Sequence, residues 1–169
     1  MDKHLQDYIS SNFKYEDGKV IRTVSKGNQK AGSELKGCIN GKRKGEQYYA
    51  TTLRHEGKRY KVFLHVVVFF LVNGYVPETV DHIDGDSLNN EPSNLRGATH
   101  KQNCQSRGTY RNSLTGYKGV SYHKATGKYR AVLANKHLGV FDTPKEAAQV
   151  YNEKALTEFG EFAKLNIIK

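Results

Sequence analysis

An aspartate-histidine pair followed by two asparagines is the part of the sequence best suited to chemistry. Asp81 and His82 are adjacent, and Asn94 and Asn103 follow in polar segments. Hydrolysis of a phosphodiester at neutral pH needs a base that activates water and a cation that neutralises the leaving oxygen. Histidine suits the first role because its ordinary pKa lies near neutrality. Asp81 and Asn103 offer hard oxygens of the kind that Mg²⁺ prefers, so the pattern favours a metal-dependent hydrolytic site.

Each piece of this pattern has a simpler interpretation when it is taken alone. An Asp-His pair is ordinary on a protein surface, and Asp84-Gly85-Asp86 is a typical turn sequence. An asparagine near a helix start, such as Asn94, is usually a cap. An EF-hand calcium loop is excluded, because Ile83 and Gly85 occupy positions that it requires to be acidic. The hydrolytic interpretation therefore depends on the combination.

The charge distribution indicates a polyanionic partner. The chain of 169 residues carries a net charge of +10, which suggests nucleic acid, although a basic protein that is merely soluble has the same composition. Residues 76–104 carry a net charge of −3, whereas the segments before and after them carry +7 and +6. This layout suits a nuclease, because basic segments hold phosphates while a few carboxylates hold a cation.

The whole run of residues resembles the HNH endonuclease family, in particular its phage and intron-encoded homing-type members. The resemblance covers roughly residues 15–105, with the ββα-metal motif at about 62–105. It implies one divalent metal ion, with Mg²⁺ expected and Mn²⁺ as the alternative. The matching motif residues are Asp81, His82, Asp84, Gly85, Asp86, Asn89, Asn90, Asn94, Leu95, Arg96 and Asn103.

The resemblance also implies a role for each site residue. His82 would be the general base, and Asn94 would orient its ring. Asp81 and Asn103 would bind the metal ion. The family usually has histidine at the last position, so His100, one helical turn earlier, could replace Asn103 as the ligand.

His65 marks a second departure from the family pattern. Members commonly have His-Arg where this chain has His65-Val66. We therefore expect His65 to be a buried, hydrogen-bonded structural residue instead of a catalytic one.

The implied activity is hydrolysis of one phosphodiester bond per active site in double-stranded DNA, leaving 5′-phosphate and 3′-hydroxyl ends. We expect a monomer instead of a dimer, and one HNH site in a monomer favours a site-specific, homing-type nickase. The alternative is a non-catalytic, sequence-specific DNA-binding regulator with a decayed nuclease fold. The intact Asp81, His82 and Asn103 argue against that alternative.

Short strands and one apolar segment are expected to position these residues. Asp17-Gly18 predicts a β-hairpin, and the runs at 48–53 and 59–64 predict another. Residues 25–45 read as a loop or weak strand. The apolar residues 66–72 fit either a strand or a buried helix, and the resemblance implies the helix.

The motif itself is predicted to be a loop followed by a helix. Residues 81–94 contain several turn formers, and a helix is plausible from about Ser93 to Ser106, with Ser93 or Asn94 near its start. A polar linker is then expected at residues 106–115.

After this linker the pattern changes to a sheet followed by a helix. Thr143 is a predicted N-cap, Pro144 lies in the first turn, and Glu146 completes a capping box. The helix should end at Gly160. The fold class is therefore α+β: N-terminal antiparallel strands and a ββα-metal motif, then a three-stranded antiparallel sheet packed on one helix. The three strands are predicted at residues 119–123, 128–133 and 136–141.

Residues 116–169 resemble the DNA-binding domain of plant ethylene-response factors. Such domains place their sheet in the major groove, where the exposed face reads bases. The implied division is a nuclease domain at 1–105, a linker at 106–115 and this domain at 116–169. The matching segments are Tyr117-Lys118-Gly119-Val120, Gly127-Lys128-Tyr129-Arg130-Ala131, Leu138-Gly139-Val140-Phe141-Asp142-Thr143, Glu146-Ala147-Ala148, Tyr151 and Ala163-Lys164-Leu165-Asn166.

Strand alternation separates the two faces of this sheet. Apolar residues are expected on the helix side: Val120, Tyr122, Tyr129, Ala131 and Leu133. Polar and basic residues of the motif, the linker and the open face are expected to contact DNA: Arg96, Arg107, Arg111, Lys118, Ser121, His123, Lys128, Arg130 and His137.

The cysteines and the apolar runs indicate whether the protein holds structural zinc, is secreted or spans a membrane. Only Cys38 and Cys104 are present, without a C-x-x-C pair, so no structural zinc is expected. No signal peptide is visible, and the longest apolar run contains His65 and is too short to span a bilayer. We expect a protein that is not secreted and not bound to a membrane, in the cytoplasm of a cell that hosts a phage or mobile element.

Overall fold

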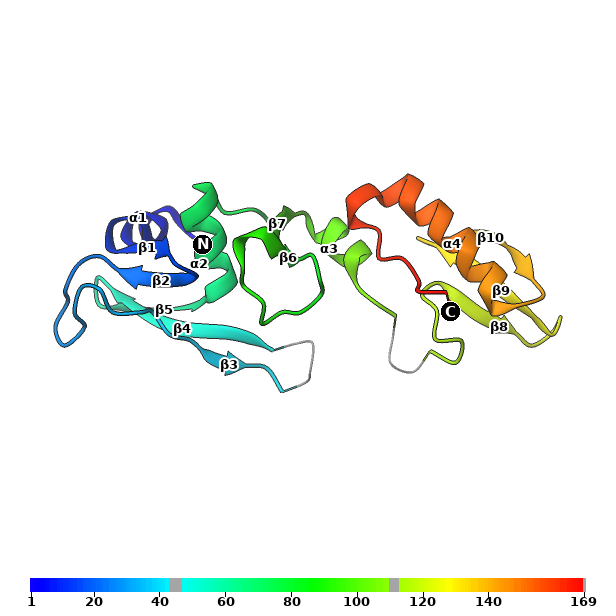
Figure 1. Cartoon of the computed structure of the whole chain (residues 1–169), viewed down its shortest axis with the longest axis horizontal. Coiled ribbons are helices and arrows are strands. Elements are labelled where there is room, and N and C mark those ends of the chain that lie inside the picture. The colour runs from blue at the N-terminus through cyan, green and yellow to red at the C-terminus, as the bar shows by residue number, and fades with distance from the viewer. Residues whose placement is uncertain (43–46, 110–112, 169) are drawn as a thin grey trace. The chain divides into compact units, whose positions relative to one another are not determined.

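The structure, a computed structural model, describes residues 1–42, 47–109 and 113–168. The chain divides into two compact units, Met1–His100 (the first unit) and Lys101–Lys169 (the second unit). Both units combine helices with small antiparallel sheets (Figure 1), so the predicted α+β class is confirmed.

Two hairpins and two helices build most of the first unit. Both hairpins are predicted from the sequence, and their turns use residues with positive φ, Asp17-Gly18 and Glu56-Gly57. Residues 25–45 include one short strand within their described part, as expected. The elements are α1 (Lys3–Asn12), β1 (Phe13–Glu16), β2 (Lys19–Arg22), β3 (Cys38–Asn40), β4 (Tyr48–His55), β5 (Lys58–Phe63) and α2 (Leu64–Asn73).

Helix α2 is the buried centre of the first unit. It occupies the apolar run that the residues alone left ambiguous, so the helix implied by the family resemblance is confirmed. Val67, Val68, Phe69 and Phe70 are buried in one core cluster. The helix ends at Gly74, whose φ of +77° gives the left-handed cap that glycine adopts without strain.

Helix α1 was not predicted, although its sequence contains a signal for it. Leu5, Tyr8 and Ile9 recur at helical spacing and are buried in the same core as α2. Asp2 caps the helix, because its side chain accepts a hydrogen bond of 2.8 Å from the backbone N–H of Leu5.

The motif region is a β-hairpin followed by a short helix, which corrects part of the sequence prediction. Asp81 and His82 end a strand instead of beginning a loop, and the helix starts at His100 instead of near Ser93. Leu95 and Ala98 are buried, so pairing as a strand stabilises this segment more than the start of a helix would. The elements are β6 (Thr79–His82), the 3₁₀ turn η1 (Pro92–Asn94), β7 (Leu95–Ala98) and α3 (His100–Ser106).

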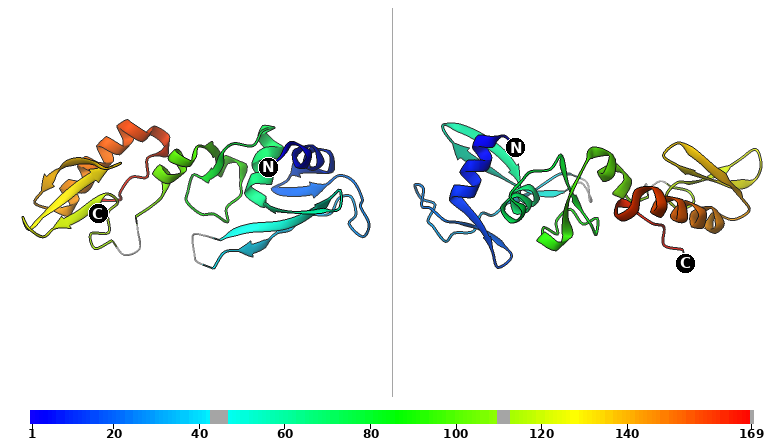
Figure 2. Two further views of the ribbon diagram at one scale, coloured as in Figure 1. Left: turned by 180° about the vertical axis from the view of Figure 1, so that it is seen from behind. Right: turned by 90° about the horizontal axis from the view of Figure 1, so that it is seen from above.

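The second unit contains the predicted three-stranded sheet and its helix. Figures 1 and 2 show α4 lying along one face of the sheet, whose strand order is β10-β9-β8. Thr143 and Glu146 form the predicted capping box, and the helix ends before Gly160. The elements are β8 (Val120–His123), β9 (Lys128–Leu133), β10 (Lys136–Phe141), α4 (Pro144–Phe159) and η2 (Gly160–Phe162).

The helix-facing side of this sheet is largely as predicted. Val120, Ala131 and Leu133 are buried against α4. Tyr122 is an exception: 47% of it is exposed, and its ring packs edge-on against Tyr129 at a centroid distance of 5.4 Å. The end of β8 therefore extends beyond the cover of the helix. In the described part of the chain, no helix is long and apolar enough to cross a membrane.

Candidate active site

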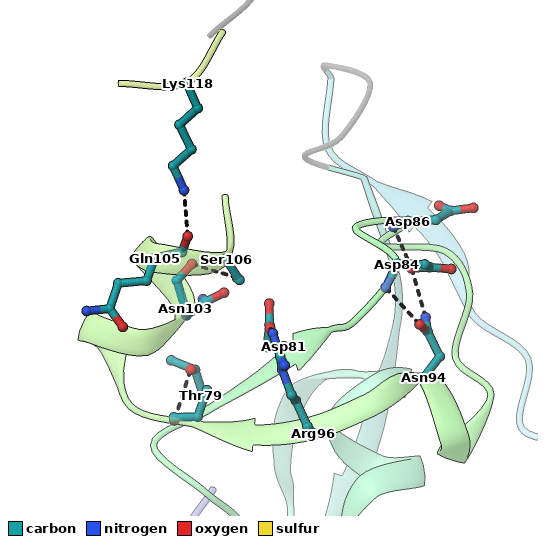
Figure 3. Close-up of polar contacts among 11 residues, drawn as sticks. Thr79, Asp81, Asp84, Asp86, Asn94, Arg96, Asn103, Gln105, Ser106 and Lys118 are labelled. Atoms are coloured by element: carbon teal, nitrogen blue, oxygen red, sulfur yellow. Dashed lines mark hydrogen bonds and ion pairs between the residues drawn. The ribbon is translucent and has the colours of Figure 1, made fainter. Parts of the chain in front are cut away.

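Asp81 and His82 lie at the end of β6, and both are buried. The register of the hairpin pairs Asp81 with Arg96 on β7. Nε and Nη2 of Arg96 donate hydrogen bonds of 2.9 and 2.8 Å to Oδ2 of Asp81, as Figure 3 illustrates. The guanidinium therefore holds the carboxylate in one orientation, since charge-assisted bonds from a planar fork are strong and directional.

An asparagine from the loop between the two strands contacts the ring of His82. Nε2 of His82 lies 3.2 Å from Oδ1 of Asn90. Tyr48 and His65 complete an aromatic surrounding, with ring centroids 6.1 and 5.0 Å from that of His82. These neighbours come from β4 and α2, so three separate elements position the imidazole.

His65 is a buried residue in contact with the His82 ring, as expected for a structural histidine. Its Nδ1 has no hydrogen-bond partner among the described residues, which corrects the expectation that it would be hydrogen-bonded. Burial, with a smaller effect from His82, lowers the pKa of His65 to about 4. His65 is therefore neutral at physiological pH.

The loop between β6 and β7 is held by a network around Asp84. Nδ2 of Asn94 donates to Oδ1 of Asp84 at 3.0 Å, and Nδ2 of Asn89 donates to its Oδ2 at 2.8 Å. The backbone N–H of Asp86 donates to Oδ1 at 2.7 Å. Burial acts to raise the pKa of Asp84, but these hydrogen bonds outweigh it and the pKa is lowered. The network therefore favours the ionised carboxylate of Asp84, which in turn fixes the loop.

Asn94 does not have the contact that the prediction gave it. Its side chain bonds to Asp84 and to the backbone oxygen of Asn89, so it does not reach the His82 imidazole. Its backbone oxygen accepts a bond of 2.9 Å from the N–H of Ile83, next to His82. Asn90, a matching motif residue to which the resemblance gave no role, is the amide beside the histidine.

The chemistry of the site fits a divalent cation of the magnesium type. Asp81 supplies a carboxylate next to the imidazole, and Mg²⁺ commonly takes few protein ligands and keeps several waters. Within the described residues, no three His, Cys, Asp or Glu side chains form a metal cluster. The carboxylate would therefore need help from an amide oxygen, water or a phosphate.

The two predicted second ligands lie on α3. Asn103 belongs to the second unit, and its backbone oxygen accepts a hydrogen bond from Ser106. Each unit is described by itself, so the pairing of Asn103 with Asp81 stays a prediction. His100, which could replace Asn103, is exposed and has its Nε2 3.4 Å from a carboxylate oxygen of Glu78.

The predicted DNA contacts divide into two groups. On the sheet of the second unit, Ser121, Arg130 and His137 are exposed. His123 contacts Thr126 within its own hairpin, and Lys128 forms an exposed ion pair with Asp142 at 2.8 Å. Arg107 is exposed as well, and Arg111 lies outside the described residues.

Arg96 and Lys118 instead have partners within the protein. The guanidinium of Arg96 is held against Asp81 on the neighbouring strand. The ammonium of Lys118 donates to backbone oxygens of Gln105 and Arg107. Both cations therefore have internal partners, and their contact with DNA stays a prediction.

Comparison with known proteins identifies the region that contains the candidate site. A model of a family described as "HNH endonuclease" matches residues 62–105, from β5 to α3. No solved structure matches the chain.

Two curated proteins match a larger part of the chain. An uncharacterized HNH endonuclease of Acanthamoeba polyphaga mimivirus is 38% identical over 114 residues, which is 64% of this chain and 59% of that protein. Protein 3.8 of Escherichia phage T7 is 35% identical over 83 residues, which is 45% of this chain and 69% of that protein.

Proposed function

Because this chain belongs to the HNH endonuclease family, we propose that it is a metal-dependent enzyme that nicks double-stranded DNA at a specific site. The observation that carries the proposal is the pair of buried residues at the end of β6, a carboxylate fixed by Arg96 beside an imidazole fixed by Asn90. Phosphodiester hydrolysis requires a base and a cation, and an anionic oxygen next to the base is suited to hold that cation.

His82 acts as the general base. With the Asn90 amide oriented as in the structure, its Oδ1 accepts a hydrogen bond from the N–H of Nε2 of His82. Nδ1 is then the basic nitrogen, and it takes a proton from the water that attacks phosphorus. The aromatic neighbours Tyr48 and His65 prevent the ring from turning away.

Asp81 and Asn103 would hold the divalent ion. When bound, the ion stabilises the negative charge that develops on the leaving 3′-oxygen. The carboxylate of Asp81 is already oriented by Arg96, so little reorganisation is needed on binding. Mg²⁺ is the expected ion and Mn²⁺ the alternative, because both accept carboxylate and amide oxygens.

The products are a 5′-phosphate and a 3′-hydroxyl end. One site in a monomer cuts one strand, which makes the enzyme a nickase of the homing type. The viral and phage sources of the two relatives support action in the cytoplasm of a host cell.

Target recognition is the function of the second unit, which resembles an ethylene-response-factor domain. The sheet is covered by α4 on one face, while Ser121 on β8, Arg130 on β9 and His137 on β10 are exposed. A basic, uncovered sheet face is suited to the major groove.

The test is nicking of supercoiled plasmid that carries candidate target sites, in Mg²⁺ or Mn²⁺. The wild type is expected to form open circles, and His82→Ala to lose this activity. His4→Ala serves as a matched control, because it removes an exposed histidine that lies outside the motif. A wild type that binds DNA specifically but leaves it uncut would favour the alternative, a DNA-binding regulator with a decayed nuclease fold.

A further inference from the structure

The side chain of Lys118 reaches back to the end of α3. Its Nζ donates hydrogen bonds of 2.6 Å to the backbone oxygen of Gln105 and 2.7 Å to that of Arg107. Figure 3 shows the first of these bonds and the position of Asn103 on the same helix. All four residues belong to the second unit.

Helix α3 is a short element whose last turn accepts hydrogen bonds from a cation outside the helix. It has seven residues, and none of them, all described in the structure, is buried. Its last turn contains no basic residue, although the carbonyl oxygens at a helix end attract a cation. Lys101, Cys104 and Gln105 line a hollow together with Arg130 and Val132 of β9. Lys118 supplies the missing cation from a segment 13 residues away from Gln105.

The backbone of Lys118 is itself fixed on both sides. Its N–H donates to Oδ1 of Asn166 at 2.6 Å, and its carbonyl oxygen accepts from Nδ2 of the same residue at 3.1 Å. Asn166 is held in turn by Asn152 of α4, through bonds of 2.7 and 2.9 Å between the Asn152 side chain and the Asn166 backbone. A continuous path of hydrogen bonds therefore leads from α4 to the last turn of α3.

We propose that Lys118 is a positioning residue for metal binding: it ties the helix that carries Asn103 to the DNA-reading sheet and α4. The ammonium does not touch DNA or the metal, and it acts through the orientation of α3. The inference rests on the proposed function of Asn103 as a ligand. It makes the second unit part of the catalytic machinery, because the domain that reads the target also fixes a residue of the metal site.

The surroundings of the ammonium fit this role better than contact with DNA. Lys118 is half-buried, and burial, with a smaller contribution from Lys164, lowers its pKa. A lysine that only binds phosphates stays in water, where its charge is fully hydrated. Lys128, by contrast, is exposed and forms an ion pair with Asp142.

The experiment compares Lys118→Met, Lys118→Arg and the control Lys128→Met in the full chain. Methionine keeps the apolar length of the side chain and removes the donor, whereas arginine keeps a cation that reaches carbonyl oxygens. Three properties are measured: amide hydrogen exchange over α3 and α4, the Mn²⁺ concentration for half-maximal cleavage, and DNA affinity.

Lys118→Met is expected to speed exchange in α3 about 10-fold and to raise the half-maximal Mn²⁺ concentration about 10-fold, as loss of bonds to a charged donor implies. Exchange in α4 and DNA affinity should stay within about 2-fold, since neither depends on this donor. Lys118→Arg should resemble the wild type. Lys128→Met should change DNA affinity alone.

The inference is overturned if α3 exchange and the Mn²⁺ requirement of Lys118→Met match the wild type, or if its only defect is weaker DNA binding. Lys118→Gln, too short to reach both carbonyls, provides the same comparison if methionine disturbs α4. A wild type without any cleavage would refute the proposed function instead. The exchange measurement would still test whether the hydrogen bonds of Lys118 stabilise α3.

Discussion

The β6–β7 hairpin and the β8–β10 sheet use polar side chains in opposite ways. In the hairpin, Asp81 and His82 are buried, and each has an internal partner, Arg96 or Asn90. On the sheet, Ser121, Arg130 and His137 are exposed. The first arrangement fixes a few groups before any substrate arrives, and the second leaves these side chains in water, where they can adapt to a charged surface.

This difference separates catalysis from binding. Groups that take part in a reaction need a fixed geometry, because small displacements of a base or ligand are costly in rate. Contacts to phosphates depend mainly on charge, so flexible side chains in water suffice. Substitutions in the hairpin should therefore change the rate constant, whereas substitutions on the sheet should change affinity.

The largest effect is expected for Asp81→Asn. The isosteric amide keeps an acceptor for Arg96 but loses the charge that holds the ion. We predict a fall of about 10³-fold in the single-turnover rate constant at saturating DNA, comparable to removal of a main electrostatic group. Asp84→Asn, which alters a loop carboxylate, is the matched control. A similar loss in both variants would show that the hairpin needs carboxylates only for its structure.

The next effect concerns stability and pH at His65. Its pKa of about 4 in the folded protein lies below the value of about 6.5 for an exposed histidine. Between these values the unfolded chain binds a proton that the folded chain does not, so the free energy of unfolding falls as the pH is lowered from 6.5 to 4. The loss from this residue is about 3 kcal/mol.

Urea unfolding at pH 7 and pH 4.5 measures this loss. His65→Phe should lose less stability on acidification than the wild type, because phenylalanine cannot be protonated. The transition of the second unit provides the internal reference. If wild type and variant lose the same free energy of unfolding between pH 7 and pH 4.5, then His65 is not a buried neutral group.

A smaller effect is expected for Asn90→Ala. Removing the amide beside Nε2 removes the contact that selects the tautomer of His82, so we predict a fall of about 30-fold in the rate constant, with DNA affinity unchanged. Asn94→Ala should mainly lower the melting temperature, since its bonds hold the loop. If Asn94→Ala slowed cleavage more than Asn90→Ala without loss of stability, then Asn94, and not Asn90, would be the residue that orients His82.

Local sequence signals explain which parts of the molecule could be predicted. Thr143, Pro144 and Glu146 are a complete helix start within four residues, and the structure contains it. Asp17-Gly18 defines its hairpin in the same way. The end of β6 was harder, because Asp81 and His82 become a strand only through pairing with β7.

Partners that come from distant segments were not predictable. Arg96 meets Asp81 across the hairpin, 15 positions apart, and the sequence gives no sign of that register. Lys118 looked like one more exposed cation until its contacts with Gln105 and Arg107 were known. Asn90 and Asn94 have the same chemistry, and only the path of the loop decides which one lies beside His82.

The most direct test of the division between catalysis and binding measures the rate constant and the DNA affinity in crossed variants. His82→Ala should reduce the single-turnover rate constant by at least about 10³-fold and leave affinity unchanged. Arg130→Ala should weaken binding several-fold and reduce the slope of its salt dependence by about one, with an unchanged rate constant at saturation. Equal changes of both quantities in either variant would contradict the account.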